Sequence, residues 1–193
     1  MAKTAWKLMI GAGIVIVMTQ SAGAAGRQVL ICMESKNLVS GRNVYVAKAQ
    51  ASAIYEKIGV ELKWARPSDC VDQGITIHIV AQAPKDAKLT ALAHARPFDH
   101  GSQQQITVFW DRVVALVGPQ QNWLAPVLGH VLAHEIGHVL LESDAHAETG
   151  LMAARWRVGE ISTMGVHPLG FSPVHVTLIH LQLDKTTSLA GTR

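Results

Sequence analysis

Residues 124–141 constrain the fold of this 193-residue chain more than any other segment, because their recurring apolar positions predict one long helix. This segment contains His134-Glu135-Ile136-Gly137-His138, the pattern H-E-x-x-H, and Asn122 is its expected N-cap. Residues four apart on a helix share one face, about 6 Å apart along the axis, so both imidazoles can reach one Zn²⁺ at about 2.0–2.1 Å. Glu135 stands beside the first histidine, where its carboxylate can accept a proton from metal-bound water. The spacing therefore predicts a zinc site with its own general base.

A catalytic zinc ion needs a third protein ligand, with the fourth position left for water. The candidates that follow the second histidine are Asp144, His146, Glu148 and, further on, Glu160. We expect His146 to bind, because imidazole is the more usual ligand in catalytic zinc sites. Asp144 is the first alternative, and Glu148 or Glu160 the next. An acid that does not bind the metal is expected to orient the free N–H of a ligand.

Gly150-Leu151-Met152 follows these candidates, and with the H-E-x-x-H helix it resembles the metzincin zinc peptidases. Residues 54–64 and the Ala-Arg-Trp run at 154–156 make the chain similar to a group of small secreted bacterial metzincin-like proteins. The resemblance covers roughly residues 28–183 and is specific over residues 133–156. It implies a zincin-like fold, and a methionine turn in which Met152 packs beneath the metal without binding it.

Three positions bear on how closely the resemblance holds. Leu141 replaces the glycine that metzincins usually carry three residues after the second histidine. Asp144 occupies the usual register of the third ligand, and an aspartate binds there in some metzincins. In the small secreted group the connection is two residues longer, which would make His146 the ligand. A glycine usually follows the helix in that group, whereas this chain has Glu142.

The N-terminus has the pattern of a cleavable export signal, residues 1–24. Lys3 and Lys7 precede an apolar run from Leu8 to Met18, and Ala22-Gly23-Ala24 supplies a cleavage site. The run is too short to span about 30 Å of hydrocarbon. Cleavage removes two lysines and no acid, so the net charge of +3 becomes +1. The mature protein is therefore expected to be secreted, to the periplasm or outside the cell, with no nucleic-acid partner and no membrane attachment.

Residues 25–193 are expected to form one domain, because no repeat, low-complexity tract or long linker interrupts them. Apolar periodicity and turn signals predict strands at 28–33, 60–64, 75–80 and 106–110. Helices are expected at 44–58, 124–141 and from Ser172-Pro173 to about residue 183, with helix or strand at 113–117 and a long loop at 81–105. This order predicts an α+β (α/β-like) fold, in which a small mixed sheet packs against helices.

Two cysteines survive cleavage and would meet an oxidising compartment. We expect Cys32 and Cys70 to form a disulfide, which would contribute about 4 kcal/mol in the chain-entropy model. Two independent buried thiols are the alternative.

The other histidines are weaker candidates, and no ligand spacing is found for His94, His100, His167, His175 and His180. His130 lies one turn before His134 on nearly the same helix face, and we expect it on the helix surface, with a cleft-lining position as the alternative. His78 is expected on the polar face of its strand. His167 or Arg155 could stabilise a tetrahedral oxyanion, although surface or packing roles are the ordinary ones for both.

Some metzincins bind substrate by adding an extended peptide to a sheet edge beside the metal. By this resemblance residues 106–110 are the candidate edge strand, with an ordinary interior strand as the alternative.

The function expected from these patterns is that of a secreted zinc metalloendopeptidase. His134, His138 and His146 would hold Zn²⁺, and Glu135 would activate water against a peptide bond of a protein or peptide substrate. The expected state is a monomer. The alternatives are a non-catalytic secreted zinc-binding or interaction module, and a zinc hydrolase or amidase of a non-protein substrate.

Overall fold

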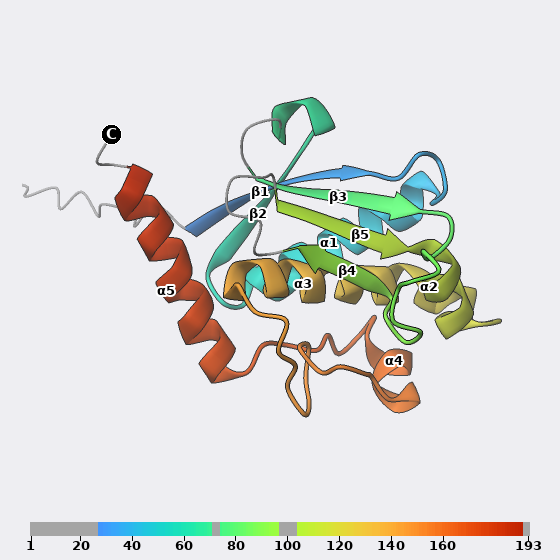
Figure 1. The fold of residues 1–193 in the computed structure, drawn as a ribbon. Helices are drawn as coiled ribbons and strands as arrows, with labels where there is room; N and C mark the ends of the chain where they lie inside the picture. The colour runs from blue at the N-terminus through green and yellow to red at the C-terminus, as the bar shows by residue number, and fades with distance from the viewer. Residues whose placement is uncertain (1–26, 71–73, 97–103, 191–193) are drawn as a thin grey trace, which may run out of the picture.

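The structure of this chain is a computed structural model that describes residues 27–70, 74–96 and 104–190 (Figure 1). The predicted export signal lies outside the described residues.

A five-stranded sheet, in the order β2-β1-β3-β5-β4, forms the upper layer of the described fold (Figure 1). Four strands run parallel, and the edge strand β4 is antiparallel to β5. The strands are β1 (Arg27–Glu34), β2 (Val60–Ala65), β3 (Ile75–Val80), β4 (Ala93–Arg96) and β5 (Gln104–Phe109). This mixed sheet confirms the predicted α+β fold class and the four expected strands.

The edge of the sheet corrects two expectations. Residues 81–105 were expected to form a loop, but β4 lies within them and β5 begins at Gln104. Strand β4 pairs with β5 on one side, so β5 is interior and residues 106–110 are not the edge. Ala93-His94-Ala95-Arg96 buries only small side chains, and so it lacks the β-branched residues by which strands are recognised.

The helices are α1 (Gly41–Glu56), α2 (Trp110–Val117), α3 (Leu124–Leu141), α4 (Val158–Thr163) and α5 (Pro173–Ala190), with short 3₁₀ turns η1 (Pro67–Cys70) and η2 (Gln121–Trp123). Helices α1, α3 and α5 confirm the three expected helices, although α5 ends later than residue 183. Residues 113–117 are helical, and α4 was not predicted. The expected N-cap is wrong, because η2 contains Asn122 and Trp123 precedes α3 without a side-chain cap bond.

Helix α3 is buried along nearly its whole length, and it packs with α1 under one face of the sheet (Figure 1). The segment 121–141 is long and apolar enough to cross a membrane by length and composition, but 83% of the apolar window is buried inside the protein. Its apolar character is therefore accounted for by its place in the core. At Gly129 the two helices touch, since a Cβ atom there would lie 2.7 Å from Gln50 Cβ and 2.9 Å from the Ala47 carbonyl oxygen.

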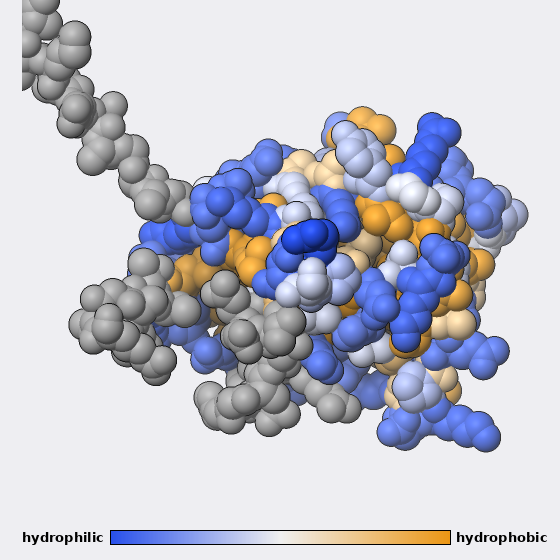
Figure 2. Space-filling model, turned by 90° about the horizontal axis from the view of Figure 1, so that it is seen from above, coloured by the Kyte–Doolittle hydropathy of each residue, from blue (hydrophilic) through white to orange (hydrophobic). Residues whose placement is uncertain are grey.

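The other face of the sheet mixes hydrophilic and apolar residues (Figure 2). On β1 and β2, Gln28 donates a hydrogen bond to Glu61 at 2.8 Å. On β3, the half-buried His78 lies 3.3 Å from a carboxylate oxygen of Glu34, as expected for a residue of the polar face.

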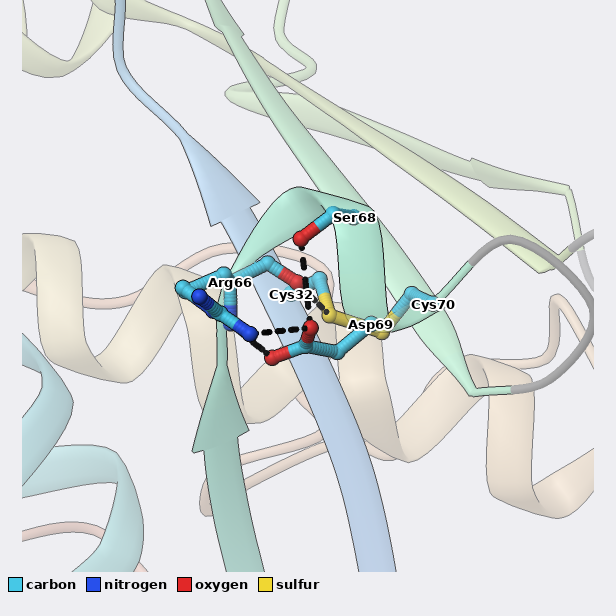
Figure 3. A network of polar contacts seen from close by, with 5 residues as sticks. All are labelled: Cys32, Arg66, Ser68, Asp69 and Cys70. Carbon is cyan, nitrogen blue, oxygen red and sulfur yellow. Dashed lines mark hydrogen bonds and ion pairs between the residues drawn. A yellow bond between two sulfur atoms is a disulfide. The ribbon is translucent and has the colours of Figure 1, made fainter.

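A disulfide joins Cys32 in β1 to Cys70 in η1, with 6.1 Å between the Cα atoms, and confirms the expected pairing (Figure 3). Beside it, the Arg66 guanidinium donates to both carboxylate oxygens of Asp69, at 3.3 and 3.1 Å, and Ser68 Oγ donates to the same carboxylate. These contacts hold η1 against the end of the sheet.

Helix α3 ends at Leu141, and the next residue, Glu142, adopts a left-handed conformation with φ 48° and ψ 40°. The Glu142 N–H donates to the Val139 carbonyl and the Ser143 N–H donates to the His138 carbonyl, both at 3.2 Å. The chain therefore makes the helix-terminating turn that glycine usually makes, with a residue whose Cβ disfavours it.

Substituting Gly129→Ala should lower the free energy of unfolding by about 1–3 kcal/mol, because the added methyl group forces α1 and α3 apart. Urea unfolding measures the change. Gly159→Ala is the matched control, since a Cβ there meets nothing within 4 Å in helix α4 and alanine is the better helix former. Equal stability of the two variants would show that the helix contact tolerates a methyl group.

Substituting Glu142→Gly should raise the free energy of unfolding by about 0.5–1 kcal/mol, because glycine adopts the left-handed turn without Cβ strain. The hydrogen bond that Glu142 accepts from Gln182 is exposed and contributes little against this gain. Glu142→Gln keeps the strain and should change the stability by less than half as much. A Glu142→Gly protein that unfolds at the same or a lower urea concentration contradicts this account.

Candidate metal centre and cleft

Helix α3 brings together the two histidines of the H-E-x-x-H pattern, and the turn after it adds a third. His134 and His138 are one helical turn apart and their Nε2 atoms lie 3.0 Å from each other. The ring of His146 lies 4.8 Å from the ring of His138 and 5.3 Å from that of His134, centroid to centroid. One potential ligand atom from each of the three histidines lies within 4.8 Å of the others. Of the residues that the structure describes, these three form the cluster that could hold a metal ion.

Backbone carbonyls determine which ring nitrogen of each buried histidine carries the proton. His134 Nδ1–H donates to the Leu151 carbonyl at 2.8 Å, and His138 Nδ1–H donates to the Ser143 carbonyl at 2.7 Å. A neutral imidazole has one N–H, so both Nε2 atoms present lone pairs. These lone pairs face each other.

Two facing lone pairs at 3.0 Å repel unless a cation lies between them. A proton does not meet this need at pH 7, because burial lowers the pKa of His134 to about 4 and also lowers the pKa of His138. Tetrahedral zinc with ligands at 2.0–2.1 Å would set the nitrogen atoms about 3.3 Å apart. The two Nε2 atoms therefore fit a zinc ion, because their lone pairs need a cation between them and their separation is close to that of two zinc ligands.

Of the acidic candidates, Asp144 lies in the same cleft as the three histidines but is not part of their cluster. Burial and the charge of Lys88 lower the pKa of His146, and the charge of Asp144 opposes this shift. Glu160 accepts the Arg157 N–H at 2.7 Å in helix α4, and the exposed Glu148 is not among the described residues of the cleft wall. The structure thus brings His146, rather than a carboxylate, to the two helix histidines.

Glu135 lies beside the cluster with 7% of its surface exposed. Burial raises the pKa of its carboxyl group to about 8. The Ala95 N–H of strand β4 donates to the carboxylate and opposes this rise. The structure therefore places a buried carboxyl group with a raised pKa beside the three histidines.

The segment Gly150–Ala153 supports the cluster from below. The Leu151 carbonyl accepts a hydrogen bond from the indole Nε1–H of Trp156 at 3.3 Å, in addition to the bond from His134. Met152 is buried, and a Cβ added at Gly137 would lie 2.7 Å from its sulfur atom. Met152 therefore packs under the helix between the two histidines. The identification of this segment with the methionine turn of metzincins remains a prediction.

His130 corrects the expectation of a surface histidine, because it is fully buried. Its Nδ1–H donates to the Pro126 carbonyl at 2.8 Å, and its Nε2 accepts the Leu169 N–H at 3.0 Å. Both ring nitrogens are thus occupied by the backbone, and His130 joins α3 to the segment that precedes α5.

A cleft of about 970 Å³ opens over the cluster. Its described walls include β4, the segment 84–92 and the residues Arg155 and Trp156 that follow Met152, while His167 is not among them. The ring of Trp156 lies edge-on to His134, with 5.7 Å between centroids. Sequence patterns did not identify Ala95, Trp156 or the segment 84–92 as part of the site. Only the fold brings them close to the three histidines.

Strand β4 is the edge strand of the described sheet, and its residues Ala93, His94 and Ala95 line this cleft. Leu92 accepts the Phe109 N–H on the β5 side, so the N–H groups of Ala93 and Ala95 point to the opposite side by strand alternation. The bond from Ala95 to Glu135 agrees with this direction.

No protein-family model and no curated protein sequence matches the chain. Among solved structures, the crystal structure of archaemetzincin from Methanopyrus kandleri matches with a TM-score of 0.56 over 83% of this chain and 98% of that chain. The two sequences are 12% identical over this match, so the likeness concerns the fold. The chain has the archaemetzincin fold, which confirms the predicted zincin-like, metzincin-like architecture.

Proposed function

We propose that this chain is an exported zinc-dependent endopeptidase. His134, His138 and His146 would hold Zn²⁺, and Glu135 would act as the general base. The observation that carries the proposal is the pair of facing Nε2 lone pairs, which backbone hydrogen bonds hold in place beside a buried carboxylate. The archaemetzincin fold and the sequence resemblance to metzincins support the same assignment.

Bound Zn²⁺ supplies a Lewis acid that lowers the pKa of water and polarises a substrate carbonyl. Glu135 would accept the proton of the attacking water and pass it to the leaving amine. Leu151 and Ser143 keep the Nε2 atoms of the two helix histidines directed at the metal, because their carbonyls hold the opposite ring nitrogens. Arg155 is one of two exposed cations of the described cleft wall, with Lys88, and could stabilise the oxyanion.

The position of β4 at the edge of the described sheet, in the wall of the cleft, favours a peptide over other substrates. An extended peptide can pair with unpaired backbone groups of an edge strand, as in β-strand addition. Ala93 and Ala95 carry small side chains, which let another backbone approach, and the strand passes directly beside Glu135. The scissile bond of a peptide paired with β4 would therefore lie over the metal cluster.

Two alternatives use the same cluster. A non-catalytic zinc module would not need Glu135, whose burial costs stability without helping to bind the metal. A zinc hydrolase of a non-protein substrate would share the chemistry but would not need the edge strand β4. Both features favour the peptidase.

Export is part of the proposal and draws on two features. The first 24 residues have the pattern of a signal peptide. The Cys32–Cys70 disulfide suits an oxidising compartment, either the periplasm or the outside of the cell. The mature protein is proposed to act as a monomer on peptide or protein substrates, with no nucleic-acid partner and no membrane attachment.

The purified mature protein should bind about one zinc ion per chain, and zinc at 100 times its Kd should raise the free energy of unfolding by about 2.7 kcal/mol. His146→Ala should weaken zinc binding by more than about 100-fold, since losing an outer-shell partner alone costs about 10–100-fold. Asp144→Ala should weaken it by less than tenfold. Chelator competition measures both. A larger loss in Asp144→Ala than in His146→Ala would make the aspartate the third ligand.

Glu135→Gln should keep the zinc ion and lower kcat for an unstructured polypeptide by about 10²–10⁴-fold, because the amide accepts no proton. The control is Glu148→Gln, an exposed carboxylate outside the described cleft wall, which should leave kcat unchanged. Retained activity in Glu135→Gln contradicts the mechanism. Stoichiometric zinc in a wild-type protein that cleaves nothing in a broad peptide library would favour the binding module.

A further inference from the structure

The segment 81–92, between β3 and β4, supplies one wall of the cleft but forms few hydrogen bonds of its own. Its internal backbone bonds are two single turns, from Ala87 N–H to Pro84 and from Ala91 N–H to Lys88, at 3.1 and 3.0 Å. Much of the segment is exposed. Its conformation must therefore be held from outside the segment.

Arg112, in the first turn of α2, provides that support. Its Nη1 donates to the carbonyls of Lys88 and Ala91, and its Nη2 donates to the carbonyl of Ala87 at 3.5 Å. The guanidinium carbon lies 5.2 Å from the centre of the Phe109 ring, which supports the group from the β5 side. Arginine has several donors in a rigid plane, whereas the single ammonium of lysine cannot reach the same three carbonyls in that geometry.

The neighbouring residue holds the other end of the segment. Both carboxylate oxygens of Asp111 accept the Ala83 N–H, at 3.2 and 3.3 Å, and the Asp111 N–H donates to the Ala81 carbonyl at 3.2 Å. Two consecutive side chains of α2 therefore fix both ends of the segment, which runs from β3 past α2 to β4 (Figure 1).

The position of this segment bears on substrate, not on the metal. The exposed Lys88 lies in the cleft wall together with Ala87 and Ala91, whose carbonyls Arg112 holds. Leu92, at the end of the segment, pairs with Phe109 and begins the register of β4. A loosened segment would thus displace both the wall and the edge strand to which a peptide would add.

We propose that Arg112 is a positioning residue for the substrate, which holds the segment 83–92 as a preformed wall of the cleft. The inference rests on the proposed peptidase function. Arg112 acts through backbone carbonyls of the wall and touches none of the three histidines. Its loss should therefore weaken peptide binding and leave the metal and the chemical step in place.

The test compares Arg112→Lys with Arg42→Lys, a matched control at an exposed arginine of α1. Amide hydrogen exchange of residues 83–92 in Arg112→Lys should accelerate by about tenfold, because three carbonyls lose a shared donor. KM for a fluorogenic octapeptide library should rise about five- to tenfold, with kcat and the zinc Kd within twofold of wild type. Arg42→Lys should leave all four quantities unchanged.

Asp111→Ala provides an independent route, because it frees only the Ala83 end of the segment and should raise KM in the same direction by a smaller factor. If Arg112→Lys does not fold, Asp111→Ala carries the comparison alone. The inference is overturned if amide exchange in Arg112→Lys is unchanged, or if exchange is faster but KM is unchanged. In either case, peptide cleavage by the wild-type protein leaves the proposed function intact. If the wild-type protein does not cleave the library and the Glu135→Gln variant does not bind its peptides, both the inference and the proposed function are overturned.

Discussion

The polar side chains of the buried helix α3 are the constraint on which the rest of the structure depends. His130, His134, Glu135 and His138 all lie in the core, where an unsatisfied polar group costs free energy. Each finds its partner in a different part of the chain. The partners are the Leu169 N–H for His130, the Leu151 carbonyl for His134, the Ala95 N–H for Glu135 and the Ser143 carbonyl for His138. The segments before α5, after α3 and at the sheet edge are thus held around one helix. These bonds leave the Nε2 lone pairs of His134 and His138 facing each other, and this makes the buried helix a candidate metal-binding element.

Much of the candidate centre could be predicted because it depends on spacing within one helix. The i, i+4 geometry alone brings His134 and His138 together. The rest depends on contacts between distant segments, for which local sequence carries little signal. Strand β4 was missed because Ala93 and Ala95 bury too little side chain to show a strand pattern, although their backbone lies at the cleft. The surface expectation for His130 failed for a related reason, since a histidine with two backbone partners can be buried, and one of these partners is 39 residues away.

The third ligand shows where spacing stops being informative. Asp144 and His146 are both candidates for the third ligand in the sequence. Which of them reaches the two helix histidines depends on the path of the chain after α3. The left-handed conformation of Glu142 ends the helix and turns Ser143 back, so that its carbonyl reaches His138. The turn leaves Asp144 at the cleft wall and carries His146 to the two helix histidines. Glutamate is an unfavourable residue for this turn, and so the local preference of the sequence gave no indication of it. The bond to His138 connects the strained turn with the orientation of a proposed metal ligand.

The two halves of the proposed site are stabilised by different physics, and this separates their functions. Two of the three histidines lie on α3, which is buried in the core. Close packing against α1 and Met152 there leaves little freedom for the rings of His134 and His138. The substrate wall is an exposed segment, and side chains of α2 hold its backbone carbonyls and amides. If the proposed function holds, changes on the surface of α2 would alter substrate affinity without disturbing the metal, whereas changes in α3 would affect both. A peptidase built in this way would vary its peptide preference through the segment 81–92, while the core that carries the proposed metal site remains the same.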